Sequence, residues 1–238
     1  MTSPMRFTKG VTNVASDKTM GQLLVPDPTS VHVFMEDFNK FNPGDWVITR
    51  VHNGATAGSE TISDADGGVL AFYPANADDD STFIQYKATA NVTTASEIFT
   101  LEAGKKLWFK ARFKVSDTGD SDFTIGLQSA DTTPLTSPVD CITFQSDDGD
   151  DNLDFHVYNT STSALSDTTI TTLSDDTYLT VGFYYDGTLR YFVNDAEVGS
   201  SSSLSVPTAA MTISFGVKNG SATARTMSVD YICVIKER

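Results

Sequence analysis

The sequence predicts an all-β fold, an antiparallel β-sandwich with an extended N-terminal arm. Three observations support this prediction. Apolar and polar residues alternate with a period of two in many short segments, which is typical of strands with one buried face. No segment of ten residues shows helical periodicity. Turn signals recur about every 8–15 residues, as they do in antiparallel sandwiches.

Residues 177–200, TYLTVGFYYDGTLRYFVNDAEVGS, give the clearest strand signal. Before the Asp186-Gly187 pair, apolar and polar positions alternate, and Val181 and Phe183 share one face. Asp-Gly favours a type I′ turn, because both central residues of that turn need positive φ. The pattern therefore predicts a hairpin of two strands with a two-residue turn. An isolated hairpin is marginal in water, so further strands are expected to cover it.

Strand after strand is predicted from residue 31 onward. The segment KKLWFKARFKV, residues 105–115, alternates most clearly of all. The predicted strand segments are 31–38, 45–51, 67–74, 81–88, 105–115, 123–129, 140–146, 153–159, 169–174, 177–200, 211–219 and 227–237. The residues of the last segment that are predicted to share one face are Met227, Val229, Tyr231, Cys233 and Ile235.

Residues 1–30 differ from the rest of the chain. They show no periodicity and carry a net charge of +1, against −16 for the remainder. Two interpretations stay open, a disordered tail and an arm that docks on another surface. Residues 31–238 contain no linker and no internal repeat, so they are predicted to form a single domain. The candidate docking residues of the arm are Arg6, Phe7, Lys9, Val11, Leu23 and Leu24.

Composition narrows the range of partners. The net charge of −15 is expected to repel nucleic acid and anionic membranes. The first ten residues lack the apolar core of a signal peptide, and no later apolar run is long enough to span a bilayer. Cys141 and Cys233 lie in apolar strands and are expected to be buried free thiols.

Three stretches of the chain resemble concanavalin A-like lectin/glucanase domains of the laminin-G-like kind. FMEDFNKFNPGDW, residues 34–46, resembles the first strand of that fold, and SVDYICVIKER, residues 228–238, resembles its closing strand. Residues 177–200 resemble its hairpin. The resemblance covers residues 31–238 and implies a jelly-roll sandwich in which the two terminal strands pair. Such sandwiches host lectins, hydrolases and structural modules.

A narrower likeness is to jelly-roll proteins from the virions of marine tailed bacteriophages. It involves SDFTIGLQSADTTPL, residues 121–135, and DCITFQSDDGDDNLDFHVYN, residues 140–159. The likeness implies a capsid decoration or head-appendage protein, assembled in the host cytoplasm and located on the virion. The implied partners are the major capsid protein or other virion proteins, with the chain forming a homo-oligomer on the particle.

The motifs for catalysis are missing from the sequence. The glucanase branch of the resembled fold cleaves glycans with carboxylates from a Glu-X-Asp-X-X-Glu strand. In this chain Glu36-Asp37 is followed by Phe-Asn-Lys, which does not match. His156 lies on the strand face opposite Phe155, and no Gly-X-Ser-X-Gly or His-Glu-X-X-His segment accompanies it. The sequence therefore predicts a protein that is not an enzyme.

An acidic loop, SDDGDDN at residues 146–152, is the candidate metal site. Closely spaced carboxylates around a glycine suit a hard cation such as Ca²⁺. The alternative is a solvated turn between strands, because acidic turns are common in this chain. No other cofactor is expected. The candidate ligands are Asp147, Asp148, Asp150 and Asp151.

Aromatic and basic residues form a candidate binding platform. Aromatic rings stack on the apolar faces of sugars, and Tyr, Trp and Arg also favour protein interfaces. Ordinary packing of a second layer is the third interpretation of the same residues. The candidate residues for a glycan or partner surface are Trp108, Arg112, Tyr158, Tyr178 and Tyr184.

Two functions are expected from these observations. The first is a non-enzymatic virion protein that attaches to a particle partly through its N-terminal arm. The alternative is a lectin-like adhesion module, with or without Ca²⁺, that binds glycans of a host surface. Hydrolysis of a glycan is a third and more distant option.

Overall fold

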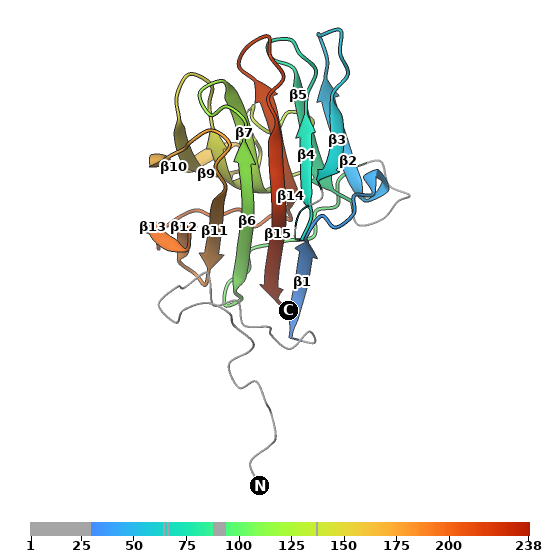
Figure 1. Ribbon diagram of the computed structural model, residues 1–238. Coiled ribbons are helices and arrows are strands. Elements are labelled where there is room, and N and C mark those ends of the chain that lie inside the picture. Colours follow the sequence, from blue (N-terminus) through green and yellow to red (C-terminus); the bar gives the residue numbers. More distant parts are fainter. Residues whose placement is uncertain (1–29, 64, 66, 88–93, 137) are drawn as a thin grey trace.

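Two antiparallel sheets pack face to face around one apolar core (Figure 1). The structure is a computed structural model that describes residues 30–63, 65, 67–87, 94–136 and 138–238. The predicted antiparallel β-sandwich is confirmed. The arm with its six candidate docking residues lies outside the described residues. Within the described part of the chain, no helix is long and apolar enough to cross a membrane.

The strands divide between the sheets in an order that differs from the order of the sequence. Sheet A has the order β13-β12-β11-β6-β15-β4-β3, and β1 pairs with β15 beside this path. Its strands are β1 (Val31–Glu36), β3 (Ser59–Ser63), β4 (Val69–Tyr73), β6 (Leu107–Val115), β11 (Leu179–Tyr185), β12 (Leu189–Val193), β13 (Ala196–Ser201) and β15 (Met227–Glu237).

Sheet B has the order β10-β9-β8-β7-β14-β5-β2. A single turn of 3₁₀ helix, η1 (Pro43–Asp45), precedes its edge strand β2. The strands of sheet B are β2 (Trp46–Val51), β5 (Ser81–Tyr86), β7 (Ser121–Gln128), β8 (Cys141–Ser146), β9 (Asn152–Asn159), β10 (Thr162–Thr172) and β14 (Thr212–Asn219).

The two ends of the sandwich segment meet, as the resemblance implied. β1 pairs antiparallel with β15, so that Val31 lies opposite Glu237. β15 also pairs with β6 along most of its length, and the two long strands lie side by side in Figure 1. This pairing closes sheet A with residues that are about 200 positions apart in the sequence, which gives the fold its mostly non-local contacts.

Phenylalanine fills the space between the sheets. Phe109 of sheet A stacks on Phe183 with ring centroids 5.0 Å apart, and Phe155 of sheet B stacks on Tyr191 at 4.3 Å. Each buried large side chain stabilises the fold by roughly 1.5–3 kcal/mol through removal of apolar area from water. The fully buried phenylalanines among the described residues are Phe38, Phe72, Phe99, Phe109, Phe113, Phe123, Phe144, Phe155, Phe183, Phe192 and Phe215.

One predicted strand face is wrong, because a bulge interrupts β15. The pairing of β15 with β6 shifts between Val229 and Tyr231. An extra residue in one strand reverses the alternation beyond it. Met227 and Val229 therefore lie in the core, whereas Cys233 and Ile235 belong to a small cluster on the outward face of sheet A.

The predicted two-residue Asp186-Gly187 turn is also wrong. Tyr185 pairs with Leu189, so three residues lie between β11 and β12, and only Gly187 of them has positive φ. The Asp186 carboxylate accepts a hydrogen bond from the backbone N–H of Thr188, which stabilises the longer loop. The following two-residue turn does have positive φ at both positions, and these are Asn194 and Asp195. The segment thus forms three strands rather than two.

Both cysteines are buried free thiols, as predicted. Cys141 has no exposed area and Cys233 is 8% exposed. Burial raises the pKa of each thiol to about 11, because a thiolate loses its hydration in an apolar environment. The thiols are therefore poor nucleophiles at neutral pH.

Candidate functional site

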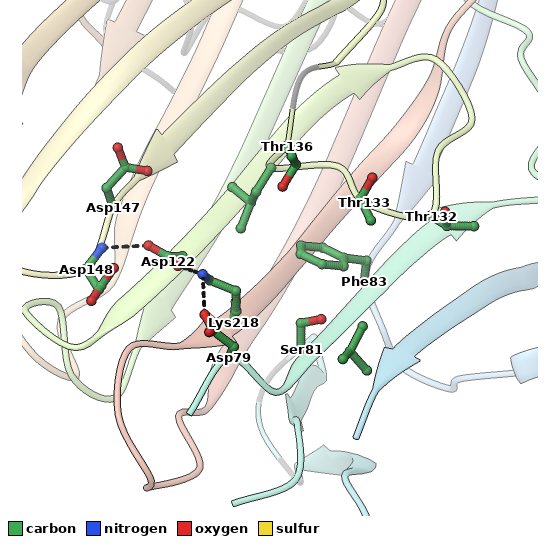
Figure 2. A pocket seen from close by; sticks show the side chains of 12 residues that line it. Asp79, Ser81, Phe83, Asp122, Thr132, Thr133, Thr136, Asp147, Asp148 and Lys218 are labelled. Atoms are coloured by element: carbon green, nitrogen blue, oxygen red, sulfur yellow. Dashed lines mark hydrogen bonds and ion pairs between the residues drawn. The ribbon is translucent and has the colours of Figure 1, made fainter. Parts of the chain in front are cut away.

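The main cavity found in the structure opens on the outward face of sheet B and has a volume of about 460 Å³ (Figure 2). Strands β2, β5, β7 and β14 form its floor, and loops supply its walls. This volume lies within the roughly 300–1,000 Å³ that is typical of small-molecule sites. The residues that line it are Val51, Asp79, Ser81, Phe83, Asp122, Thr132, Thr133, Leu135, Thr136, Asp147, Asp148 and Lys218.

Phe83 lies on the floor of the pocket because β14 carries a glycine beneath it. Gly216 pairs with Phe83 in the sheet. A Cβ atom at Gly216 would lie 2.3 Å from Cδ1 of Phe83, so any larger residue would displace the ring. The glycine thus allows an aromatic ring to lie flat across the neighbouring strand on an otherwise polar face.

Lys218 links two acidic residues that line the pocket (Figure 2). Its Nζ atom lies 2.7 Å from Oδ2 of Asp122 and 2.8 Å from Oδ1 of Asp79. Burial lowers the pKa of Lys218, but the two carboxylates outweigh this effect and raise the pKa above its ordinary value. Lys218 therefore stays protonated, and two of the four lining carboxylates are already paired with it.

Asp147 and Asp148 follow β8 and face the same cavity. The charge of Asp122, and to a lesser extent burial, raises the pKa of Asp148. Burial first and Asp122 second raise the pKa of Asp147. The backbone N–H of Asp148 donates to Oδ1 of Asp122 at 2.6 Å, which holds the two residues together. These carboxyl groups keep their protons to higher pH than isolated aspartates do.

The acidic turn that presents Asp79 is anchored by its neighbour Asp80. Asp80 has no exposed area, and its carboxylate accepts hydrogen bonds from the backbone N–H groups of Asn53, Gly54 and Ala77. Burial alone would raise the pKa of Asp80, but these three donors hold it below its ordinary value. Asp80 thus fixes the wall that carries Asp79.

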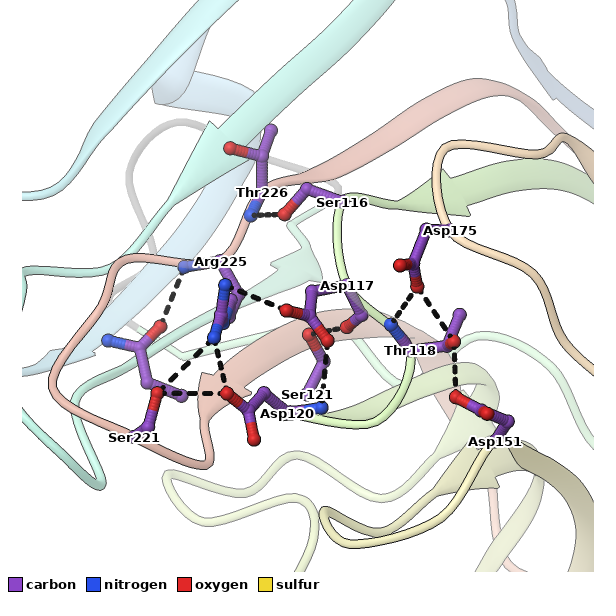
Figure 3. A network of polar contacts seen from close by, with 11 residues as sticks. Ser116, Asp117, Thr118, Asp120, Ser121, Asp151, Asp175, Ser221, Arg225 and Thr226 are labelled. Carbon is purple, nitrogen blue, oxygen red and sulfur yellow. Dashed lines mark hydrogen bonds and ion pairs between the residues drawn. The ribbon is translucent and has the colours of Figure 1, made fainter.

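The four candidate calcium ligands do not come together. Asp147 and Asp148 face the pocket, whereas Oδ1 of Asp150 accepts from the backbone N–H of Asn152 at 2.8 Å. Oδ1 of Asp151 lies 2.6 Å from the hydroxyl of Thr118, in a separate polar network (Figure 3). In the described part of the chain, no group of three or more His, Cys, Asp or Glu residues is arranged to hold a metal ion. Calcium binding stays a prediction.

The network of Figure 3 instead ties loops together at one end of the sandwich. Arg225 pairs with Asp117 at 2.9 Å and also with Asp120. Thr118 donates its backbone N–H to Asp175 at 2.8 Å. These contacts join the turn before β7 to the loops before β11 and β15, so the acidic residues there have structural partners.

The predicted aromatic and basic platform is divided between the sheets. Trp108 and Tyr184 stack on the outward face of sheet A at 5.2 Å, and the guanidinium of Arg112 lies 4.1 Å from the ring centre of Tyr178. Tyr158 belongs to β9 of sheet B, on the opposite side of the molecule. Four of the five candidates thus share a surface.

His156 lies on the outward face of β9, as the alternation indicated. Its Nε2 atom lies 3.8 Å from Oδ2 of Asp154, and its buried Nδ1 atom has no hydrogen-bond partner among the described residues. Burial lowers the pKa of His156 despite the nearby carboxylates of Asp154 and Asp147. The histidine is therefore neutral at pH 7.

Sequence reasoning missed most of the pocket. The sequence predicts Asp147 and Asp148 as metal ligands and does not single out Phe83, Asp122 or Lys218. These three residues are separated by 39 and 96 positions in the chain, and no spacing in the sequence links them. An aromatic residue on the polar face of β5 was the one available signal.

The pocket can hold and polarise hydroxyl groups. Carboxylates, threonine hydroxyls and the ammonium group of Lys218 face the same space as an aromatic ring. Moreover, the charge of Asp122 raises the pKa of Asp148, which is the direction of shift that a proton-donating carboxyl group needs.

No family model matches this chain, and neither does any curated protein. Solved structures do match over nearly the whole chain. An endo-1,3-β-glucanase from Streptomyces sioyaensis has a TM-score of 0.62 at 14% identity and covers 89% of this chain and 98% of its own. A β-1,3-1,4-glucanase (lichenase) derived from a mouse hindgut metagenome has a TM-score of 0.57 at 14% identity, and the match covers 85% of this chain and 98% of the glucanase. The carbohydrate recognition domain of Emp47p has a TM-score of 0.56 at 12% identity, and the match covers 90% of this chain and 100% of that domain.

These likenesses confirm the concanavalin A-like jelly-roll fold and correct one functional prediction. The prediction that the chain is not an enzyme is contradicted by these comparisons, because most of the similar structures are enzymes that act on glycans. The missing Glu-X-Asp-X-X-Glu motif excludes only one arrangement of carboxylates. The virion context finds no support in the comparisons, so the virion location and virion partners stay predictions.

Proposed function

We propose that the pocket on the outward face of sheet B binds a glycan. One observation carries this proposal: an aromatic ring, carboxylates and threonine hydroxyls converge on one cavity of suitable size. A sugar has apolar C–H faces and a rim of hydroxyl groups, so it needs this combination of a ring and polar groups. The glucanases and carbohydrate recognition domains that share the fold support the same class of ligand.

The charge of the pocket selects among glycans. Four aspartates and one lysine line the cavity, and the lysine is already paired with Asp79 and Asp122. A uronate would bring a further negative charge beside Asp147 and Asp148, whose pKa values are already raised by Asp122. We therefore expect neutral or amine-bearing glycans to bind better than acidic ones.

Calorimetric titration with three oligosaccharides tests the proposal. The probes are hexasaccharides of a neutral β-1,3-1,4-glucan, of chitosan and of a polyuronate, each with and without a chelator to check for a calcium requirement. We expect binding of the first two, and a loss of about tenfold or more in affinity for Phe83→Ala, which equals about 1.4 kcal/mol. Asp176→Asn, an exposed change at a residue that does not line the pocket, is the matched control.

The outcomes separate clearly. Binding that survives Phe83→Ala at full strength would place the glycan elsewhere on the molecule. Absence of binding to all three probes, and to an array of other glycans, would refute glycan recognition by this chain.

Hydrolysis of the bound glycan is a second candidate function, favoured by the raised pKa of Asp148 beside Asp122. Glycoside hydrolysis uses a pair of carboxyl groups, of which one acts as the acid and the other as the base or nucleophile. New reducing ends are expected when the neutral glucan is incubated with the protein, and Asp148→Asn is expected to lower their rate of release by about 100-fold. An equal rate in the variant would assign the cleavage to other residues or to a contaminant.

A further inference from the structure

The outward face of sheet B is polar but mostly covered. Thr124, Gln128, Thr143 and Ser214 point away from the core and yet have no exposed area, and Gln85 is only 3% exposed. Polar side chains are seldom buried unless they make hydrogen bonds. The question is therefore what covers these residues and which of them hold the cover in place.

Over Gln85 and Gln128 the cover is the first part of the connection between β7 and β8, residues 129–136, which we call the cover loop. Gln85 donates from Nε2 to the carbonyl oxygen of Ser129 at 3.4 Å and accepts at Oε1 from the backbone N–H of Asp131 at 3.1 Å. Gln128 donates from Nε2 to the carbonyl oxygen of Pro134 at 2.8 Å. Two glutamines of the sheet thus hold the backbone of the loop at both ends.

The contacts continue from Gln85 to the wall of the pocket. Asp131, held by Gln85, accepts at Oδ1 from the backbone N–H of Thr133 at 2.9 Å and from its hydroxyl at 3.3 Å. The carbonyl oxygen of Thr133 in turn accepts from the backbone N–H of Thr136 at 2.9 Å. Thr133 and Thr136 both line the cavity, and Figure 2 shows them on the side away from Asp147.

We propose that Gln85 is a positioning residue of the glycan pocket, which sets the place of the threonine wall without touching the ligand. The proposal rests on the function proposed above. Gln85 does not line the cavity, but it is the sheet residue that bonds both sides of Ala130 and thereby orients Asp131 and Thr133. Its amide also donates to the hydroxyl of Ser214 at 3.2 Å, so the side chain is fixed from below.

Gln85→Met, Thr133→Val and the double variant test the proposal. Methionine keeps the length of glutamine and removes its hydrogen bonds, and valine keeps the shape of threonine and removes the hydroxyl. The matched control is Gln145→Met, because Gln145 is also buried on this face but its side chain bonds Thr143 at 3.0 Å, within its own strand, and no other side chain of the described residues. The probe in each titration is the neutral glucan hexasaccharide.

We expect about tenfold weaker binding for Gln85→Met and for Thr133→Val, and no further loss in the double variant, because both changes break the same chain of contacts. Gln145→Met is expected to bind as the wild type does. Amide hydrogen exchange at residues 131–136 is expected to speed up in Gln85→Met, while exchange in β7 and β14 stays slow.

Each outcome counts for or against the proposal. Unchanged affinity in Gln85→Met, while Phe83→Ala loses binding, overturns the positioning role and leaves the proposed function intact. If the loss of affinity in the double variant equals the product of the two single losses, Gln85 and Thr133 act independently, and Gln85 has a purely structural role. If the wild-type protein binds no glycan, the proposed function fails and the positioning role fails with it.

Discussion

The outward faces of the two sheets differ in how their charged and aromatic groups find partners. On sheet A, Arg112 pairs with Asp230 and stacks over Tyr178, while Lys114 pairs with Asp176 at 2.9 Å. Each of these cations has its own acidic partner at the surface. On sheet B, Lys218 alone among the lining residues faces four carboxylates, and polar residues around it are buried under the cover loop.

This difference indicates where a ligand is expected. On sheet A, Arg112 and Lys114 have acidic partners within the protein, and the rings of Trp108 and Tyr184 stack on each other. The pocket on sheet B keeps two carboxyl groups with raised pKa values and an aromatic ring beside a cavity. Carboxyl groups with shifted pKa values beside an open cavity are typical of functional sites.

The largest expected effect is on Asp80, which anchors the pocket wall. Asp80→Ala removes three charge-assisted hydrogen bonds from buried backbone donors and should lower the free energy of unfolding by about 3 kcal/mol. Because the folded pKa is lowered, the carboxylate stabilises the fold above its unfolded pKa of about 3.9, and this stabilisation is lost as the pH falls through the folded pKa.

Urea denaturation at pH 7 and at successively lower pH values measures this effect. The difference in free energy of unfolding between the wild type and Asp80→Ala should become smaller as the pH falls into the acidic range. Asp176→Asn, at a site 67% exposed in the loop before β11, keeps a side chain that tolerates the positive φ there and should change stability by less than about 0.5 kcal/mol. Equal effects at the two sites would remove the contrast between the faces.

The two lysines allow the most direct comparison of the faces. Lys218→Met leaves Asp122, whose side chain is only 7% exposed, without its cation and should destabilise the fold by about 2 kcal/mol. Lys114→Met breaks a pair with an exposed aspartate and should cost less than about 0.5 kcal/mol. Thermal denaturation of the two variants in parallel tests this comparison. A larger fall in melting temperature for Lys114→Met than for Lys218→Met would contradict it.

A smaller effect is expected at the aromatic surface of sheet A. Tyr178→Leu removes the contact between its ring and Arg112 and should destabilise the fold by about 0.5 kcal/mol, since the site is partly exposed. Glycan affinity should stay unchanged when it is measured by the same titration. A clear loss of glycan binding would move the ligand to sheet A.

The smallest effect, and the only stabilising one, is expected for Asp148→Asn. Asp122 raises the pKa of Asp148 in the folded state, so ionisation of Asp148 disfavours the fold, and the variant should melt slightly higher at pH 7. Below the unfolded pKa of about 3.9 both states are protonated, and the advantage should disappear. An advantage that persists unchanged at pH 3 would rule out this electrostatic origin.

The sequence pattern predicted the strands well where alternation was regular. In β6, five apolar residues at alternate positions are all buried in the core. The pattern failed at β15, because the bulge near Asp230 adds one residue and moves Cys233 and Ile235 outward. It also missed β3, whose residues SETIS are too exposed to show a buried face.

The candidate site was predicted less well, for a related reason. Asp147 and Asp148 stand out in the sequence because they belong to a cluster of acidic residues, yet their role in the pocket depends on Asp122 and Lys218 from other strands. Strand pairing brings Lys218 beside both Asp122 and Ser81. No local pattern encodes such neighbours, because register is a property of the assembled sheet.

The sequence by itself determined the two-layer β architecture, the apolar core and the buried thiols, since a period of two and burial of large apolar residues follow from local chemistry. Only the tertiary structure decided which polar residues meet. The strand order of sheet B and the cover loop held by Gln85 and Gln128 create the pocket. Contacts between distant segments depend on how the whole chain packs, and alternation along one strand carries no information about its neighbours.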